Sequence, residues 1–171
     1  KDKPHVLCLK KKKLLEKISY IFRKHKLGSQ EAKLCAEVIV NAELVEASSH
    51  GVSRLKMYCE RIKKKLINPQ AKIKIKKISK SISLVNANNS IGFVAADVGI
   101  NQAIFNAKKT GFGLVGVRNS GHYGLSSYFI EKAVKKNLVA MCFTNAPPAI
   151  APHGAKKSLF GTNPISFGFP S

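Results

Sequence analysis

Residues 49–58 combine the side-chain types that can bind a small carboxylate and move a proton. His50, Arg54 and Tyr58 follow one another at intervals of four residues. Residues four apart lie on the same face of a helix, so this spacing predicts that an imidazole, a guanidinium and a phenol point to one place. Histidine exchanges a proton near neutral pH, and the planar guanidinium matches a carboxylate. The segment therefore predicts a site for a small carboxylic acid.

Polar residues also collect in loops at the ends of predicted strands. Segment 118–124, Arg-Asn-Ser-Gly-His-Tyr-Gly, lies between an apolar strand pattern and a helix pattern, and it contains His122. Ligands of α/β proteins bind beyond the carboxyl ends of strands, and a helix N-terminus attracts a phosphate or carboxylate. Two polar turns, 144–148 and 161–164, also follow or precede predicted strands. Each segment alone is more typical of an ordinary surface loop or turn than of a site.

Hydrophobic periodicity divides the chain into an N-terminal helical portion, residues 1–70, and an α/β portion, residues 71–171. In the first portion, Gly28 is expected to close one helix and Ser29 to cap the next. The expected helices are 14–22, 29–42, 52–62, 92–109 and 125–136, and the expected strands are 73–78, 83–87, 114–117, 138–143 and 165–169. Strands 114–117 and 138–143 read as buried, and strand 73–78 as having one solvent-exposed face. The alternation of strands and helices predicts a mixed α/β layer packed beside the helical portion.

The charge balance favours a lysine-rich surface over specific nucleic-acid recognition. Thirty Lys and Arg residues against nine Asp and Glu residues give a formal net charge of +21. Only four of the thirty are arginines, the residues that read bases and clamp phosphates, and the lysines are spread along the whole chain. A basic protein that binds polyanions without enzymatic activity remains the alternative, because such a charge attracts polyanions nonspecifically.

The cysteines and apolar runs predict a cytoplasmic protein that has no metal site and does not enter a membrane. Cys8, Cys35, Cys59 and Cys142 show no C-x-x-C spacing and are expected to be reduced and mostly buried. The five histidines also lack the spacing of zinc ligands. No apolar run approaches the roughly 18 residues of a membrane span, and no secretory signal is visible at residue 1.

Four ordered motifs resemble a known enzyme family. They are S-H-G-V-x-R-L-x-x-Y at 49–58, V-R-N-S-x-H-Y-G at 117–124, T-N-x-P-P-x-x-A-P-x-G at 144–154 and G-T-N-P-I-x-F at 161–167. Together they resemble the N-terminal half of the malate/L-lactate dehydrogenase family of the non-Rossmann type. Relatives in that family include ureidoglycolate dehydrogenase, sulfolactate dehydrogenase and cyclic-imine reductase. The absence of a G-x-G-x-x-G sequence after a strand agrees with a non-Rossmann nucleotide-binding fold.

The resemblance implies hydride transfer between NAD or NADP and C2 of a small 2-hydroxy or 2-oxo acid, in a homodimer. By matched position, it assigns catalytic roles to His122 and His50, with Ser49 orienting His50. The residues that it places against the substrate are Arg54, Tyr58, Thr162 and Asn163. The residues that it places at the cofactor are His122, Tyr123, Gly124, Leu125, Ser126, Thr144 and Asn145.

The sequence departs from the family pattern at a few positions. Glu43 stands where an aspartate is common, Val45 and Glu46 replace an arginine and a glycine, and Ala155 replaces a glycine. The later cofactor motifs of the family belong to a second half, so we expect the chain to be an N-terminal fragment. An inactive family member is the other alternative.

Overall fold

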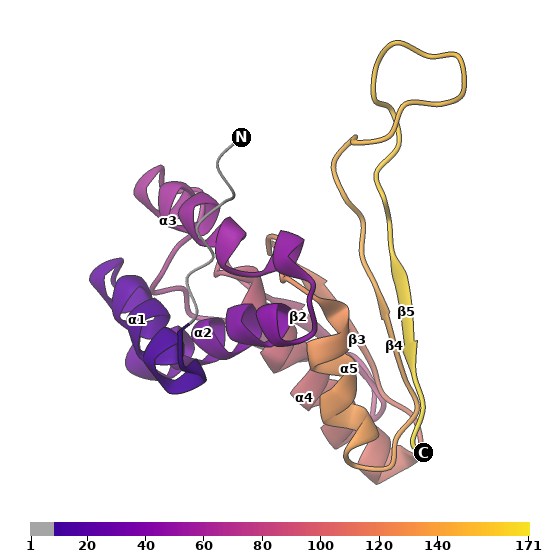
Figure 1. Cartoon of the computed structure of the whole chain (residues 1–171). Helices are drawn as coiled ribbons and strands as arrows, with labels where there is room; N and C mark the ends of the chain where they lie inside the picture. The colour runs from indigo at the N-terminus through magenta and orange to yellow at the C-terminus, as the bar shows by residue number, and fades with distance from the viewer. Residues whose placement is uncertain (1–8) are drawn as a thin grey trace, which may run out of the picture. The chain divides into compact units, whose positions relative to one another are not determined.

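The computed structural model describes residues 9–171, which form two compact units (Figure 1). The first unit ends at Leu125, and the second comprises Ser126–Ser171. The predictions for His5 and Cys8 lie outside the described residues. The compact units are not divided at residue 70, where the sequence changes from helices to strands. The helices and the three-stranded sheet share one unit because α4 (Gly92–Thr110) packs against both α2 (Ser29–Leu44) and the sheet.

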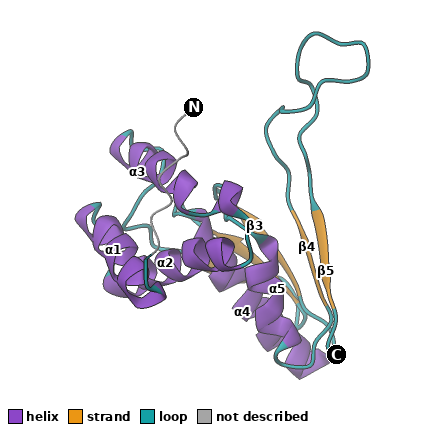
Figure 2. Cartoon of the chain, in the orientation of Figure 1, coloured by secondary structure: helices purple, strands orange, loops and turns teal. Residues whose placement is uncertain are grey.

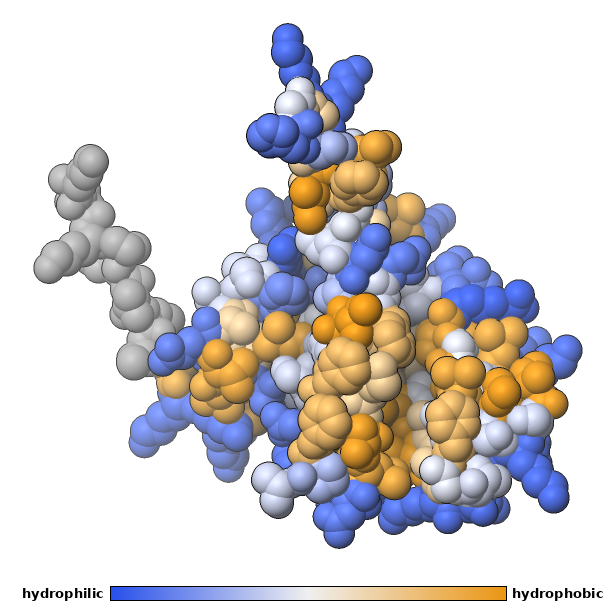
Figure 3. All heavy atoms as spheres, turned by 90° about the vertical axis from the view of Figure 1, so that its right-hand side faces the viewer, coloured by the Kyte–Doolittle hydropathy of each residue, from blue (hydrophilic) through white to orange (hydrophobic). Residues whose placement is uncertain are grey.

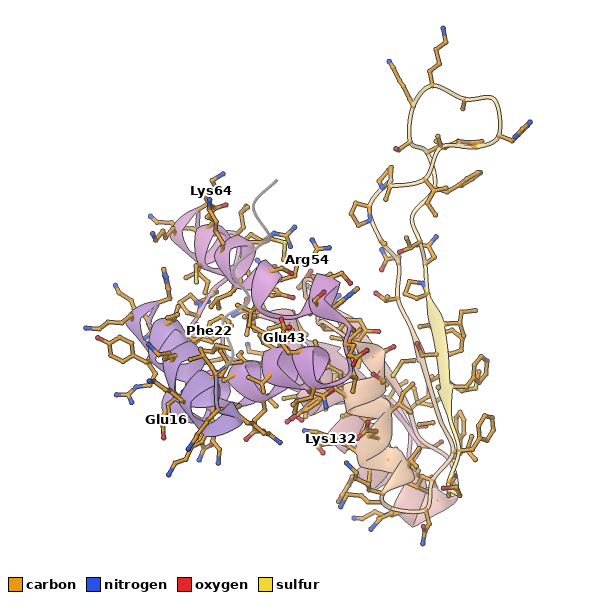
Figure 4. All side chains as sticks on the ribbon, in the orientation of Figure 1. Glu16, Phe22, Glu43, Arg54, Lys64 and Lys132 are labelled. Carbon is orange, nitrogen blue, oxygen red and sulfur yellow. The ribbon has the colours of Figure 1, made fainter. Side chains whose placement is uncertain are left out.

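The predicted N-terminal helices form, but the connection between them differs from the prediction. α1 (Lys11–Lys24) packs on α2 through a core that includes the fully buried Phe22 (Figure 4). The connection is made by Lys26, which adopts a left-handed φ of 68°, and the Leu27 N–H donates to the Phe22 carbonyl. Gly28 is instead the N-cap of α2, and Ser29 is the first helical residue. The predicted closure by Gly28 and capping by Ser29 are therefore wrong, because the chain has already turned at Lys26.

A three-stranded mixed sheet follows the helices in the first unit. Strand β2 (Ile82–Asn86) lies in the centre, antiparallel to β1 (Lys74–Lys77) and parallel to β3 (Leu114–Arg118). The connection from β2 to β3 is α4, which ends at Gly111 with a left-handed φ of 79°. The α/β prediction is confirmed here.

The second unit is a helix beside a long hairpin (Figure 2). Helix α5 (Ser126–Val134) packs against the antiparallel strands β4 (Ala140–Phe143) and β5 (Ile165–Gly168). Beyond these strands, the chain continues as an extended arm with a bridge between Ile150 and Phe160. Gly168 allows β5 to lie close to α5. A Cβ at this position would lie 2.1 Å from Ile130 Cγ2.

The strands are much more exposed than the sequence predicts. All four residues of β1 are exposed, because β1 is an edge strand, and β3 forms the other edge. In β4, predicted as buried, Phe143 is 61% exposed. Figure 3 shows apolar side chains gathered along the hairpin. The exposed apolar side chains of β4, β5 and the adjoining residues are Val139, Met141, Phe143, Ile165, Phe167 and Phe169. An apolar strand is buried only where a layer covers each face, and α5 covers one face of this hairpin.

Candidate active site

The turn that carries His50 and Arg54 is not part of a regular α-helix. Two 3₁₀ turns, η1 (Ser48–His50) and η2 (Val52–Arg54), precede α3 (Leu55–Lys63). The predicted helical stripe of His50, Arg54 and Tyr58 is therefore wrong as local structure. Gly51 interrupts the helix with a ψ of −140°, and the three side chains approach the site from separate elements.

Glu43 of α2 holds this turn in place (Figure 4). Its Oε1 accepts a hydrogen bond of 2.6 Å from the Val52 N–H, which starts η2. The carboxylate also fills the space beside Gly51, where a Cβ would lie 2.0 Å from Glu43 Oε1. The Glu43 carboxylate can reach the Val52 N–H because Gly51 has no side chain in its way.

Hydrogen bonds within the turn orient His50 and Arg54. Ser49 Oγ lies 3.0 Å from His50 Nδ1. The Nε of Arg54 donates to the Ser49 carbonyl at 2.7 Å, which ties the guanidinium to the residue before His50. Arg54 is exposed, so its head group is open to a ligand.

His122 lies in the loop after β3, and both backbone and side-chain contacts hold that loop. The Asn89 N–H donates to the Asn119 carbonyl at 2.8 Å, and Asn119 Nδ2 donates to Asn86 Oδ1 at 3.0 Å. The first residue of α4 is Gly92, and a Cβ there would lie 2.2 Å from the His122 carbonyl oxygen. The loop thus rests on the start of α4 and on the ends of β2 and β3.

The fold of the first unit brings Tyr58, His50 and His122 together. The Tyr58 hydroxyl lies 2.7 Å from His122 Nδ1, and the Gly124 N–H donates to the same nitrogen at 3.2 Å. The rings of His50 and His122 stack with centroids 5.5 Å apart and an interplanar angle of 26°. Tyr58 is 1% exposed and packs on Phe93 at 4.8 Å between ring centroids.

Burial and neighbouring cations keep both histidines neutral more readily than in water. Burial lowers the pKa of His122 from 6.5 to about 4, with smaller contributions from His50, Arg54 and Arg61. Burial and then Arg54 lower the pKa of His50. Burial raises the pKa of Tyr58, so its hydroxyl keeps its proton. The two histidines can therefore accept a proton or form hydrogen bonds. An anion bound beside Arg54 would favour protonation of the histidines.

Several predicted residues belong to the second unit. Asn163 Oδ1 accepts a hydrogen bond from the Ala146 N–H at 2.9 Å and so closes the turn at 161–164 against the turn at 144–148. Ser126 Oγ lies 2.5 Å from Ser166 Oγ. Thr144 Oγ1 lies 3.1 Å from the Asn145 carbonyl. Their predicted roles at the substrate or cofactor, and those of Thr162, Tyr123 and Leu125, stay predictions.

Sequence reasoning missed two residues that support the site. Gly92 reads as an ordinary helix start, and only the tertiary contact with the His122 carbonyl explains it. Phe93 is fully buried, and its ring packs against Tyr58. No local pattern reveals either contact. Among residues 9–171, no cluster of three or more His, Cys, Asp or Glu residues is placed to hold a metal.

Three of the four predicted thiols lie in the described part of the chain, and all three are free cysteines. Cys35 is buried, and Cys59 and Cys142 are partly buried. Within the same residues, no helix is both long and apolar enough to cross a membrane.

The fold and the site together define a mixed α/β protein in which the 3₁₀ turns before α3 and the loop after β3 bring a histidine pair and an arginine together. The family model for malate/L-lactate dehydrogenase matches residues 9–171, and the chain belongs to this family. The resemblance seen in the four sequence motifs is thus confirmed.

Individual relatives agree with this membership. The chain is 40% identical to malate/(S)-sulfolactate dehydrogenase of Methanothermus fervidus over 145 residues, which cover 85% of this chain and 43% of that protein. It is 33% identical to ureidoglycolate dehydrogenase (NAD(+)) of Escherichia coli O157:H7 over 144 residues, 84% of this chain and 41% of the relative. The solved malate dehydrogenase of Pyrococcus horikoshii OT3 superposes with a TM-score of 0.94 at 32% identity, covering 99% of this chain and 49% of that one. The chain therefore spans between two fifths and half the length of these relatives.

Proposed function

We propose that the protein is a nicotinamide-dependent oxidoreductase that transfers a hydride between NAD or NADP and C2 of a small 2-hydroxy or 2-oxo acid. The observation that carries the proposal is the stacked pair His50 and His122 beside Arg54, in a chain of the malate/L-lactate dehydrogenase family. Malate, lactate and sulfolactate are substrates of the proposed class. The names of the relatives support this class and leave the particular acid open.

Arg54 is proposed to bind the substrate carboxylate. Its Nε is engaged by the Ser49 carbonyl, which leaves the two terminal nitrogens as a fork for two carboxylate oxygens. The negative charge of a bound substrate would offset the cations that disfavour protonation of the histidines. Thr162 and Asn163 are the other proposed substrate contacts, and Tyr58 is proposed to belong to the substrate site through its contact with His122.

His50 and His122 are proposed to handle the proton of the C2 oxygen. Reduction of a ketone leaves an alkoxide that must be neutralised, and a positioned histidine contributes roughly 10²–10⁴ in rate. Ser49 is proposed to orient His50, in keeping with the 3.0 Å contact between Ser49 Oγ and His50 Nδ1.

The loop around His122 suits a nicotinamide cofactor in its chemistry. Residues 119–125 contain no carboxylate that would repel phosphates, and a Cβ at Gly121 would meet nothing within 4 Å, so the backbone is open to close approach. The residues proposed to hold the cofactor are His122, Tyr123, Gly124, Leu125, Ser126, Thr144 and Asn145. When bound, the nicotinamide supplies or takes up the hydride.

The test is oxidation of NADH and NADPH by the full-length protein on addition of oxaloacetate, pyruvate or sulfopyruvate. We expect His122→Ala to lower kcat by about 10²–10⁴. We expect Arg54→Ala to raise KM by roughly tenfold to hundredfold, because a charged hydrogen bond is lost. Arg23→Ala, on the exposed face of α1, is the matched control and should leave both constants unchanged. Kinetics of His122→Ala and Arg54→Ala that match those of Arg23→Ala would refute the site.

The same experiments separate the two alternatives. Stabilisation of the protein by NADH or NADPH without turnover would indicate an inactive family member. A steep loss of RNA affinity with salt, with no stabilisation by either cofactor, would indicate a polyanion-binding protein. A homodimer and a cytoplasmic location are part of the proposal and are checked by sedimentation and by fractionation of cells.

A further inference from the structure

The Nδ1 atom of His122 faces two groups, and one of them can only donate a hydrogen bond. The Gly124 N–H donates to this nitrogen at 3.2 Å, and the Tyr58 hydroxyl lies 2.7 Å from it. A backbone N–H has no lone pair to offer. Nδ1 must therefore act as the acceptor, and the Tyr58 hydroxyl then also donates to it.

We propose that Tyr58 is a positioning residue that, together with the Gly124 N–H, holds neutral His122 in the tautomer with its proton on Nε2. This inference rests on the proposed function and deepens it. The Nε2–H bond is then the group that His122 presents to the C2 oxygen of the substrate. In a neutral imidazole, the hydrogen bond at one ring nitrogen determines the state of the other.

The surroundings of Tyr58 hold its hydroxyl at this place. The phenol is 1% exposed, packs against Phe93, and is carried by α3, whereas His122 belongs to the loop after β3. Gly124 has a φ of +78°, and a Cβ there would lie 2.8 Å from Phe93. The same aromatic ring therefore supports both donors to Nδ1.

The tautomer has a consequence for the balance of protons. The charged groups that act on His122 are His50, Arg54 and Arg61, all cationic when protonated, and a proton added at Nδ1 would face the Gly124 N–H. His122 therefore serves as a neutral hydrogen-bond donor to the oxygen. A bound nicotinamide would supply the hydride to C2. The oxygen would then take its proton from His50, whose protonation a substrate carboxylate beside Arg54 would favour, and His50 would be left neutral.

The test is the ¹⁵N spectrum of the full-length protein labelled at histidine, recorded near pH 7. We expect the Nδ1 signal of His122 to be that of an unprotonated nitrogen and the Nε2 signal to be that of a protonated one. The His122 signals are assigned by their loss in His122→Asn. A protonated Nδ1 in this spectrum would by itself overturn the proposal, and no Tyr58 variant is needed for that result.

Tyr58→Phe keeps the buried ring and removes only the hydroxyl. Loss of one hydrogen bond to the neutral form should raise the pKa of His122 by about 0.5 to 1 and allow the second tautomer to appear. It should also lower kcat more than it raises KM. Tyr20→Phe, whose tyrosine is 57% exposed on α1, is the matched control. A Tyr58→Phe spectrum and titration identical to those of Tyr20→Phe would overturn the proposal.

These readouts are independent of the proposed reaction. An Nε2–H tautomer that depends on Tyr58, in a protein without dehydrogenase activity, would refute the proposed function and leave the positioning role intact. Dehydrogenase activity in a protein whose His122 tautomer does not depend on Tyr58 would refute the positioning role and support the proposed function.

Discussion

Replacing Gly92 with alanine should destabilise the protein, although alanine normally stabilises a helix. Gly92 is buried at the start of α4, and a Cβ would lie 2.2 Å from the His122 carbonyl oxygen and 2.4 Å from the Gly121 carbonyl oxygen. Both atoms belong to backbone, so neither can rotate away as the end of a side chain would. The loop must move, and with it the ring of His122.

The magnitude follows from two opposing effects. Overpacking against a rigid neighbour costs about 3 kcal/mol at the upper end of its usual range, and alanine recovers about 1 kcal/mol of helix propensity. The net loss is about 2 kcal/mol, which corresponds to a fall in Tm of roughly 4–8 °C for a chain of this size. Urea unfolding and thermal unfolding, each followed by circular dichroism, measure both quantities.

Gly99 provides the matched control in the same helix. A Cβ at this position would meet the Val117 side chain at 3.0 Å, and Val117 is 41% exposed on an edge strand, so it has room to turn. Gly99→Ala should therefore change the stability by less than about 1 kcal/mol. A Gly92→Ala protein as stable as Gly99→Ala, with unchanged His122 signals, would refute the claim that the loop rests on Gly92.

Two further predictions concern acid and backbone strain. Because burial lowers the pKa of His122 to about 4, the unfolded chain binds more protons between that pH and 6.5, so stability falls as the pH falls through this window. After discounting for solvent screening of a half-buried ring, the loss is about 1–2 kcal/mol. The loss of stability between pH 7 and pH 4.5, measured by urea unfolding, should be smaller in His122→Asn than in the unsubstituted protein. Equal losses in the two proteins would contradict this prediction. Glu46 follows Val45, the C-cap of α2, with a left-handed φ of 59°, and it is exposed, so Glu46→Gly should stabilise by about 0.5–1 kcal/mol, or about 2 °C in Tm. A lower Tm in Glu46→Gly would show that its backbone is not strained.

Much of the element order could be predicted from periodicity. The α4 pattern ended by Gly111, the parallel strands on either side and the two N-terminal helices all appear where the spacing of apolar residues places them. The burial of strands could not be predicted, because an apolar strand has the same sequence whether or not a layer covers its second face. Leu114 and Phe143 are exposed for that reason.

The residue types of the site came from the sequence alone, and their arrangement did not. His50, Arg54 and His122 are recognisable because an imidazole can exchange a proton, a guanidinium can bind a carboxylate, and the motifs resemble a family. The predicted helical stripe failed because Gly51 breaks the helix, a backbone choice that depends on Glu43, eight residues earlier on α2. That the Tyr58 hydroxyl meets His122, 64 residues later, follows only from the packing of α3 beside the loop after β3. Sequence determines which chemistry is available through side-chain type, whereas the tertiary structure decides which atoms meet, because hydrogen bonds and ring stacking act over a few ångströms between segments far apart in the chain.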